Sequence, residues 1–363
     1  MEGTLQLVLR QEADLIEPRQ QETTDHQALR SMLRDFYGQQ VQHTDDLETK
    51  ACCTDDTAQR YGHILEMLPD EVRDRQYGCG CPLPIDSLRG LRVVDLGSGA
   101  GVDAFIALHR VGPSGNVQGI DMTREQLEVA QRNAALVAQR FEHPQVNIAF
   151  HEGFIETADA IDNDSIDLVI SDCVINLSPA KEEVFRSIWR VLKPGGEFFV
   201  SDIAADRRVP LSIRNDPRMV AECLGGAEYE HDWFDQMRAA GFVDPRVASR
   251  RIVQQEAMGE AITFYSLNVR GFKLPEMDLR CEDYGQLATY KGSVDGSEAR
   301  YEFDDHHVFE KGRPTAVCRN TARMLSETRL GDHFEVTAPI RHFGLFACDS
   351  PPVQRQDGGV ACC

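Results

Sequence analysis

The stretch from Leu91 to Asp103 reads L-R-V-V-D-L-G-S-G-A-G-V-D, and it decides the fold. A short β-branched run ends at Asp95-Leu96 and gives way to three glycines before a helical pattern begins at Val102. This order is typical of a buried parallel strand that leads through a tight loop into a helix. Glycine lets the backbone turn sharply and approach a ligand, while the first helical amides stay free to donate to it. We therefore expect a ligand site at the carboxyl end of this strand.

Strands and helices are predicted to alternate after this loop. The expected strands are 91–96, 116–121, 146–150, 165–171 and 197–202, with later strands at 246–253 and 262–271. The expected helices are 102–110, one opened by a Thr123–Gln126 capping box, one from Pro179 to Leu192 that the Lys193-Pro-Gly-Gly196 turn stops, and 230–240 before Gly241. This β-α-β order predicts an α/β fold, a Rossmann-like doubly wound parallel sheet with ligands at the carboxyl ends of its strands.

The segments on either side of the sheet differ from it in pattern. Apolar residues at helical spacing predict an amphipathic helix from Ala28 to Tyr37, after about two dozen polar residues that we expect to form a mobile lead-in. Beyond about Met277 the pattern alternates with period two, which favours a small α+β C-terminal domain. We divide the chain into an N-terminal segment and helix (1–50), the ligand-binding domain (51–276), the small domain (277–349) and a disordered tail (350–363).

Composition narrows the class of protein. With 363 residues the chain can build a sizeable core. A formal net charge of -21 argues against a nucleic-acid surface and against docking on anionic membranes. There is no apolar run long enough to span a membrane and no secretory signal, so we expect a cytoplasmic protein. We also expect a monomer.

Thiols are unusually numerous for such a chain. The eleven cysteines are Cys52, Cys53, Cys79, Cys81, Cys173, Cys223, Cys281, Cys318, Cys348, Cys362 and Cys363. In a reducing compartment such a set is more often catalytic, or binds a soft metal, than it forms a disulfide framework.

Two cofactor classes use a glycine loop of this kind. A dinucleotide fingerprint is G-x-G-x-x-G, but the third glycine position here holds Val102. The run D-L-G-S-G-A-G instead resembles motif I of the class I S-adenosylmethionine-dependent methyltransferases. The resemblance implies that Asp121 accepts hydrogen bonds from the ribose hydroxyls and that Gly153 to Glu156 bracket the adenine. The cofactor residues expected are Tyr77, Gly97, Ser98, Gly99, Asp121, Met122, Ile155 and Glu156.

Three cysteines fall in segments that should meet at this edge of the sheet. Cys79 precedes the first strand, Cys173 follows the fourth directly, and Cys223 lies in the irregular region after the fifth. Thiolates select soft centres, and three of them would hold trivalent arsenic in a pyramid with its lone pair free to attack a sulfonium methyl group. The protein would then supply positioning and dry surroundings. A zinc site ranks below this reading because the chain has no C-x-x-C pair.

The combined motifs A-C-C-T, Y-G-C-G, D-L-G-S-G, G-I-D-M-T, S-D-C-V-I-N-L and E-C-L-G-G resemble those of the arsenite S-adenosylmethionine methyltransferases. The resemblance implies that Cys173 and Cys223 bind arsenic, that Cys79 completes the site, and that Cys52 forms a disulfide with Cys79 as arsenic changes oxidation state. It also implies that Tyr77 lines the cofactor. The expected reaction methylates arsenite and then methylarsenite, giving mono- and dimethylated arsenicals for detoxification, with glutathione or thioredoxin as thiol reductant.

Several alternatives stay open at this point. Cys53 lies next to Cys52, and Cys81 lies two residues after Cys79, so either member of each pair could be the functional thiol. We favour Cys52, because it follows Ala51, and Cys79, because it lies between two glycines. Isolated cysteines are usually small buried hydrophobes, which we expect of Cys281, Cys318 and Cys348. The tail pair Cys362-Cys363 is a hypothetical arsenic-capture site. The rival functions are a methyltransferase for an organic small molecule and a non-enzymatic, thiol-rich metalloid-binding protein.

Overall fold

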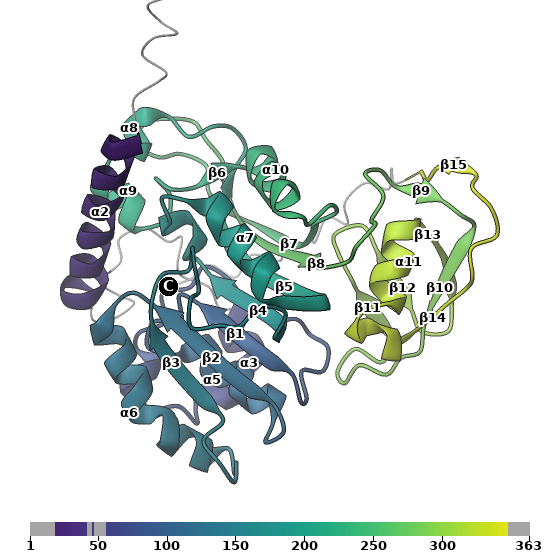
Figure 1. Cartoon of the computed structure of the whole chain (residues 1–363), viewed down its shortest axis with the longest axis horizontal. Coiled ribbons are helices and arrows are strands. Elements are labelled where there is room, and N and C mark those ends of the chain that lie inside the picture. Colours follow the sequence, from purple (N-terminus) through teal and green to yellow (C-terminus); the bar gives the residue numbers. More distant parts are fainter. Residues whose placement is uncertain (1–18, 42–45, 47–55, 348–363) are drawn as a thin grey trace, which may run out of the picture.

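The computed structural model describes residues 19–41, 46 and 56–347. Figure 1 shows a central sheet with helices on both faces and a smaller β-rich unit beside it. The strands of the central sheet are β1 (Arg92–Leu96), β2 (Asn116–Asp121), β3 (Ile148–Glu152), β4 (Ile166–Asp172), β5 (Leu192–Ala205), β6 (Glu228–Tyr229), β7 (Arg246–Gln254) and β8 (Phe264–Phe272).

The central sheet has the order β3-β2-β1-β4-β5-β8-β7, and β6 pairs with the end of β5. Strands β1 to β5 are mutually parallel, as the β-α-β pattern predicts. The expected Rossmann-like fold is confirmed, but the sheet is mixed. Strand β8 runs antiparallel to both β5 and β7, because a short connection rather than a crossover helix joins β7 to β8.

Helices cover both faces of this sheet. They are α3 (Asp56–Leu65), α4 (Asp70–Arg73), α5 (Val102–Val111) and α6 (Arg124–Arg140), with α7 (Lys181–Val191), α10 (Glu230–Ala240) and the 3-10 turn η4 (Ile175–Leu177). On β1, Val93 packs into the cluster with α5 and α6, and Val94 packs into the cluster with α7 and α10. Both faces of β1 are buried, which explains its continuous apolar run.

Three local expectations are wrong in detail. Thr123 precedes α6 without a side-chain cap, and the Gln126 side chain donates to the carbonyl of Tyr37 at 2.7 Å, so no capping box forms. Pro179 lies before the helix rather than in it, since α7 begins at Lys181. The Lys193–Gly196 turn is an irregular part of β5, where the register shifts between Ile166 and Leu168 of β4.

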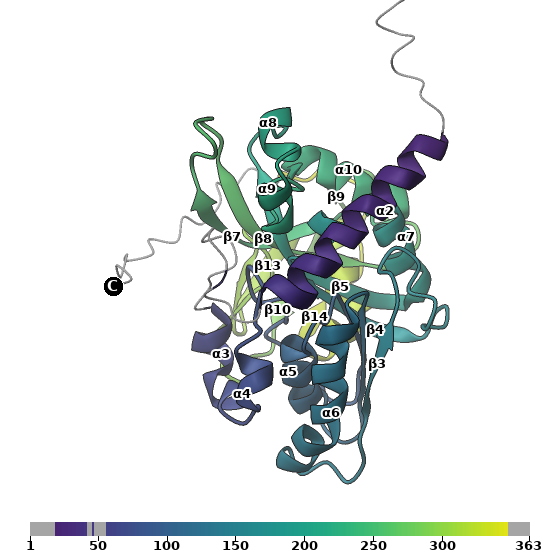
Figure 2. The same cartoon turned by 90° about the vertical axis from the view of Figure 1, so that its left-hand side faces the viewer.

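The N-terminal helix α2 (Arg19–Asp35) begins earlier than expected and continues into the π-helical turn η1 (Phe36–Gln40). Leu33 is fully buried, and Leu29 and Met32 pack beside it against the cluster that contains the thiols. Figure 2 shows α2 crossing the molecule in front of the sheet, beside the short helices α8 (Leu211–Arg214) and α9 (Pro217–Ala221). The amphipathic helix therefore covers the ligand edge of the sheet.

The C-terminal unit has small antiparallel sheets and one α-helix. Its elements are β9 (Glu282–Asp283), β10 (Gln286–Tyr290), β11 (Arg300–Glu302), β12 (Val308–Glu310), β13 (Pro314–Val317), α11 (Arg319–Ser326), the 3-10 turn η5 (Arg329–Asp332), β14 (Phe334–Val336) and β15 (Gly344–Leu345). Its aromatic core includes Tyr290, Tyr301 and Phe309. At the junction with the central sheet, the Arg329 guanidinium pairs with the buried carboxylates of Asp86 and Glu197.

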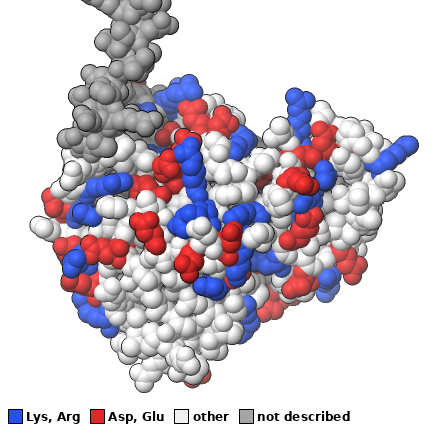
Figure 3. All heavy atoms as spheres, in the orientation of Figure 1, with Lys and Arg blue, Asp and Glu red and all other residues white. Residues whose placement is uncertain are grey.

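The surface is mixed in charge on the face shown in Figure 3, where acidic and basic side chains are interspersed. Among residues 19–41, 46 and 56–347, no helix has the length and apolar character needed to cross a membrane.

Candidate functional site

A cavity of about 1010 Å³, counted to its open mouth, lies at the carboxyl ends of β1, β2 and β4. All the residues expected to bind the cofactor line it: Tyr77, Gly97, Ser98, Gly99, Asp121, Met122, Ile155 and Glu156. Cys173 lines the same cavity.

The glycine loop forms one wall of the cavity. Gly97 has φ +77°, and a Cβ there would lie 2.5 Å from the Val174 side chain. Gly101 has φ +93° and immediately precedes α5. A larger residue at Gly97 would therefore be strained and would collide with the segment that follows Cys173.

Asp121 is fixed at the end of β2 by two backbone amides. Gly99 donates to one carboxylate oxygen at 2.9 Å, and Thr123 donates to the other at 2.7 Å. Burial raises the pKa of Asp121, while these amide hydrogen bonds act in the opposite direction. Each oxygen keeps further acceptor capacity, so the carboxylate can bind two hydroxyl groups of a ligand in the cavity.

Buried acidic groups give the cavity its electrostatic character. Burial, together with the charges of Asp172 and Asp121, raises the pKa of Asp95 to about 8. Burial and the nearby Asp95 raise the pKa of Asp103 to about 8 as well. Ser98 Oγ and Asp103 Oδ1 are buried without a hydrogen-bond partner among the described residues. A cationic ligand with hydrogen-bonding groups would neutralise these buried carboxylates and pair with the unpartnered oxygens. S-adenosylmethionine carries both an ammonium and a sulfonium charge.

The N-terminal helix closes the outer side of the cavity. Arg30 pairs with Glu156 at 3.0 Å and lies over the ring of Phe154, 4.3 Å from its centroid. Glu156 also accepts a hydrogen bond from Ser178 at 2.8 Å. Burial raises the pKa of Tyr77 to about 12, so its phenol stays neutral where it lines the cavity. Sequence reasoning missed Arg30, although its place on the amphipathic helix is a usable signal.

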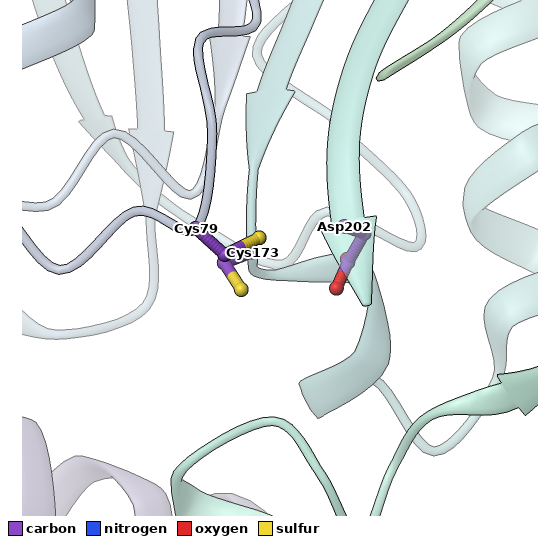
Figure 4. A group of neighbouring side chains, drawn as sticks. All are labelled: Cys79, Cys173 and Asp202. Carbon is purple, nitrogen blue, oxygen red and sulfur yellow. The ribbon is translucent and has the colours of Figure 1, made fainter. Parts of the chain in front are cut away.

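Two thiols and a carboxylate gather beside the cavity. The ligand atoms of Cys79, Cys173 and Asp202 all lie within 4.8 Å of one another, and all three residues are buried. Figure 4 shows the three side chains directed toward one region between the strand ends. Burial raises the pKa of Asp202 to about 7, although the amides of Ile203 and Asn176 donate to its carboxylate.

Cys223 lies next to this group but outside it. Its thiol donates to the backbone carbonyl of Cys173, with Sγ and O 3.1 Å apart. Cys79, Cys173 and Cys223 belong to one buried cluster beneath α2. The three expected cysteines therefore lie in one region of the fold. The group whose ligand atoms lie within 4.8 Å of one another, however, contains the Asp202 carboxylate in place of the Cys223 thiol.

The loop that carries Cys79 is held tightly against β4 and β5. Asp172 Oδ1 accepts the amides of Cys79 at 3.0 Å and Gly80 at 3.2 Å. A Cβ at Gly78 would lie 1.8 Å from Asp172 Oδ2, and one at Gly80 would lie 1.9 Å from Ser201 Oγ. The two glycines of Y-G-C-G are therefore required for the thiol to reach this position.

Strained backbone marks the other two thiols. Cys173 has φ +57° and Cys223 has φ +67°, values that non-glycine residues rarely adopt. The amide of Cys173 is fixed by the carbonyl of Ser201 at 2.8 Å. Such strain persists only where the surroundings impose it, and it is common at functional sites.

The paired thiols of the N-terminal loops separate in space. Cys81 packs in the hydrophobic cluster under α5, away from Cys79, and burial raises its pKa to about 11. The structure therefore favours Cys79 over Cys81 for ligand binding. Five cysteines lie outside the described residues: Cys52, Cys53, Cys348, Cys362 and Cys363.

Sequence reasoning also missed Asp172 and Asp202. Asp172 is the last residue of β4 and directly precedes Cys173, whereas Asp202 lies inside β5, which continues to Ala205. An acidic residue at a strand end beside a candidate ligand is the signal that would have identified Asp172.

Comparison with known proteins agrees with this geometry. Residues 87–244 match a family model described as a methyltransferase domain, and residues 284–355 match an arsenite methyltransferase C-terminal domain. The arsenite methyltransferase of Aquipseudomonas alcaligenes is 41% identical over 346 residues, which cover 91% of this chain and 99% of that protein. The human arsenite methyltransferase is 35% identical, over 82% of this chain and 81% of that protein.

A solved structure shares most of the architecture. The crystal structure of an arsenic(III) S-adenosylmethionine methyltransferase from Chlamydomonas reinhardtii matches with a TM-score of 0.75 and 42% identity. The match covers 78% of this chain and 98% of that chain. With relatives above 30% identity over most of its length, the chain belongs to the arsenite methyltransferase family.

Proposed function

We propose that this protein transfers methyl groups from S-adenosylmethionine to trivalent arsenic held by Cys79, Cys173 and Cys223. The observation that carries the proposal is the position of Cys173. This residue lines the cofactor cavity and is also one of the two thiols in the buried group with Asp202. A soft ligand set therefore opens directly onto the site for a methyl donor.

Arsenite binding is an exchange of oxygen for sulfur. Each thiol replaces one hydroxyl of As(OH)₃, so that three As–S bonds form, three As–O bonds break and three molecules of water leave. Apolar side chains such as Leu33, Leu177 and Leu224 line the thiol cluster. They exclude water from the arsenic, whose remaining lone pair is the nucleophile.

The chain positions the two substrates rather than exchanging protons with them. Bound S-adenosylmethionine supplies the methyl group as a sulfonium. Asp121 holds the ribose hydroxyls, the Gly97 loop allows close backbone approach, and Tyr77, Met122 and Ile155 line the remaining walls. Asp172 keeps Cys79 in place through two backbone amides. Correct placement of this kind supplies a large part of the rate of a bimolecular reaction.

A reductant is needed because methyl transfer leaves arsenic pentavalent. We assign the two electrons to Cys52 and Cys79: the Cys52 thiolate attacks the arsenic-bound sulfur of Cys79, the S–S bond forms, and the As–S bond breaks with its electron pair left on arsenic, which returns to the trivalent state. An external thiol, glutathione or thioredoxin, then reduces that disulfide. The cycle gives mono- and then dimethylated arsenicals and calls for a reducing, cytoplasmic compartment, where cysteines stay free. The cavity and the thiols come from one chain, so we propose a monomer.

Arsenic speciation over time tests the proposal. The full-length protein is incubated with arsenite, S-adenosylmethionine and thiol reductant, and the methylated arsenicals are separated and counted. Cys173→Ser and Cys223→Ser should abolish all methylation, whereas Cys52→Ser should lose methylation of arsenite and keep methylation of methylarsenite. Full activity of Cys173→Ser on arsenite would refute the role of that thiol. Arsenite binding without consumption of S-adenosylmethionine would indicate a protein that binds the metalloid without methylating it.

A further inference from the structure

A second pair of thiols lies in the C-terminal unit. Cys281, just before β9, lies in a segment that packs on the start of α11, where the Asp278 amide donates to Asn320 Oδ1 at 2.9 Å and the Arg319 guanidinium lies over the ring of Tyr284. Cys318 caps the N-terminus of α11, where its sulfur accepts the amide of Thr321 at 3.5 Å and contacts the Thr321 hydroxyl at 3.3 Å. The two cysteines are far apart in sequence, so the fold itself brings them together.

A buried guanidinium faces this pair. Arg246, the first residue of β7, places a terminal nitrogen 3.8 Å from the Cys318 sulfur. Its guanidinium is anchored by Asp244 at 2.6 Å and Asp304 at 3.2 Å, and its Nε is buried with no partner among the described residues. A cysteine that only filled space would have neither a cation nor a second thiol beside it.

The charge state of the pair follows from these contacts. The hydrogen bond from Cys281 lowers the pKa of Cys318, and Arg246 and Thr321 act in the same direction against the effect of burial. A thiolate beside a thiol is the reactive form of a dithiol, because the thiolate is the ligand and the nucleophile. Cys318 is buried, as expected, but its sulfur also has polar contacts with Arg246 and Thr321.

The pair is separate from the proposed arsenic site. Figure 1 places α11 and β9 on the opposite side of the central sheet from α2 and α9. The other described cysteines belong to different clusters, Cys81 to one and Cys79, Cys173 and Cys223 to another. Cys281 is partly exposed while Cys318 is buried, so a ligand would enter from the side of Cys281.

We propose that Cys281 and Cys318 form a second site for trivalent arsenic, a dithiol that takes a monosubstituted arsenical of the form R–As(OH)₂. Two As–S bonds form and two As–O bonds break. The two hydroxyl groups leave as water, one with the proton of Cys281 and the other with a proton from solvent. Two thiols satisfy R–As completely, whereas arsenite would keep one hydroxyl.

The natural ligand rests on the proposed function. If the enzyme methylates arsenite, the first trivalent product is methylarsonous acid, CH₃–As(OH)₂, which has the two exchangeable hydroxyls that this dithiol can replace. The site would then hold the monomethylated intermediate on the protein between transfers. Binding of a monosubstituted arsenical to the pair requires no methyl transfer, so the site can be tested on its own.

The test uses phenylarsine oxide, a monosubstituted trivalent arsenical, on the full-length protein without S-adenosylmethionine. Alkylation of each cysteine by iodoacetamide is followed by peptide mass spectrometry. Saturation should protect Cys281, and Cys318→Ser should remove that protection and weaken binding at this site by at least about 100-fold, the gain expected from a second linked contact. Serine is a good N-cap residue, so this variant should keep α11 folded.

A matched control and a second measurement secure the result. Cys81→Ala removes a buried thiol elsewhere and should leave the protection of Cys281 unchanged. Cys281→Ser should lower the arsenic bound per chain by one equivalent. Alkylation of Cys281 at the same rate with and without phenylarsine oxide would overturn the proposal, as would protection that survives in Cys318→Ser. Failure of the proposed function would appear differently, as absent methylated arsenicals with Cys281 still protected.

Discussion

Gly78→Ala should disable arsenite methylation, because the new methyl group displaces the thiol of the neighbouring Cys79. The substitution itself removes no thiol. The new Cβ would lie 1.8 Å from Asp172 Oδ2 and 2.5 Å from Asp172 Cγ. Contacts under 3.0 Å are essentially never observed for a real Cβ, so either the loop or the Asp172 carboxylate must move by more than 1 Å. That movement breaks the 3.0 Å hydrogen bond between the Cys79 amide and Asp172.

The expected size of the effect follows from this displacement. A misplacement of about 1 Å at a reacting centre can lower the rate by roughly 100-fold, and overpacking typically costs about 1–3 kcal/mol of stability. We expect the rate of arsenite methylation to fall by about 100-fold or more. The melting temperature should fall by roughly 2–12 °C, at about 2–4 °C for each kcal/mol lost in a domain of this size.

The assay compares initial rates of arsenite methylation with thermal unfolding of the same preparations. Gly62→Ala is the matched control, because a Cβ at Gly62 meets no atom within 4 Å and the residue lies in α3. It should keep full activity and equal or greater stability, since alanine favours helix by up to about 1 kcal/mol. Gly78→Ala with activity within about threefold of the unchanged protein would refute the argument for the loop.

Asp121→Asn should raise the dissociation constant for S-adenosylmethionine about 10- to 150-fold, because hydrogen bonds to a charged group contribute roughly 1.5–3 kcal/mol; calorimetric titration checks this, and unchanged affinity would remove Asp121 from the cofactor site. Cys81→Ala should keep arsenite methylation while losing roughly 1 kcal/mol of stability, the usual cost of a small deletion in a core; loss of activity in a folded variant would reopen the choice between the paired thiols. Asp304 should make stability depend on acid pH: burial raises its pKa, but His307 and Arg246 outweigh this and hold it at about 2, below the ordinary 3.8. Its contribution of about 2 kcal/mol is present above pH 4 and lost as pH falls toward 2. Urea unfolding of Asp304→Asn should therefore approach that of the unchanged protein as pH drops, and a difference that stays constant would contradict the assignment.

The glycine loop and the strand that precedes it were predictable because local physics determines them. A β-branched run that turns at Gly97 can bury both faces of its strand in only a few ways, and the acidic residue at Asp121 follows from the same topology. The antiparallel direction of β8 was not predictable from periodicity, since the sequence pattern of a buried strand is the same in either direction. Gln126 shows the same limit, because its partner, the carbonyl of Tyr37, comes from a distant helix.

The thiol site divides in a similar way. Strand ends place Cys173 at the ligand edge, so its position was expected from the sequence. The choice between Cys79 and Cys81 depends on which side of a loop faces β4, and only the Asp172 hydrogen bonds decide it. Asp202 was missed because a carboxylate among thiols has no motif of its own.

The most direct test of the account is X-ray absorption at the arsenic edge on the full-length protein loaded with one equivalent of arsenite. Each of Cys79→Ser, Cys173→Ser and Cys223→Ser is loaded in the same way. The account predicts three As–S bonds and no As–O bond in the unchanged protein, and two As–S bonds with one As–O bond in each variant that still binds. Three As–S bonds retained in Cys173→Ser or Cys223→Ser would contradict it, because arsenic would then be held by other thiols.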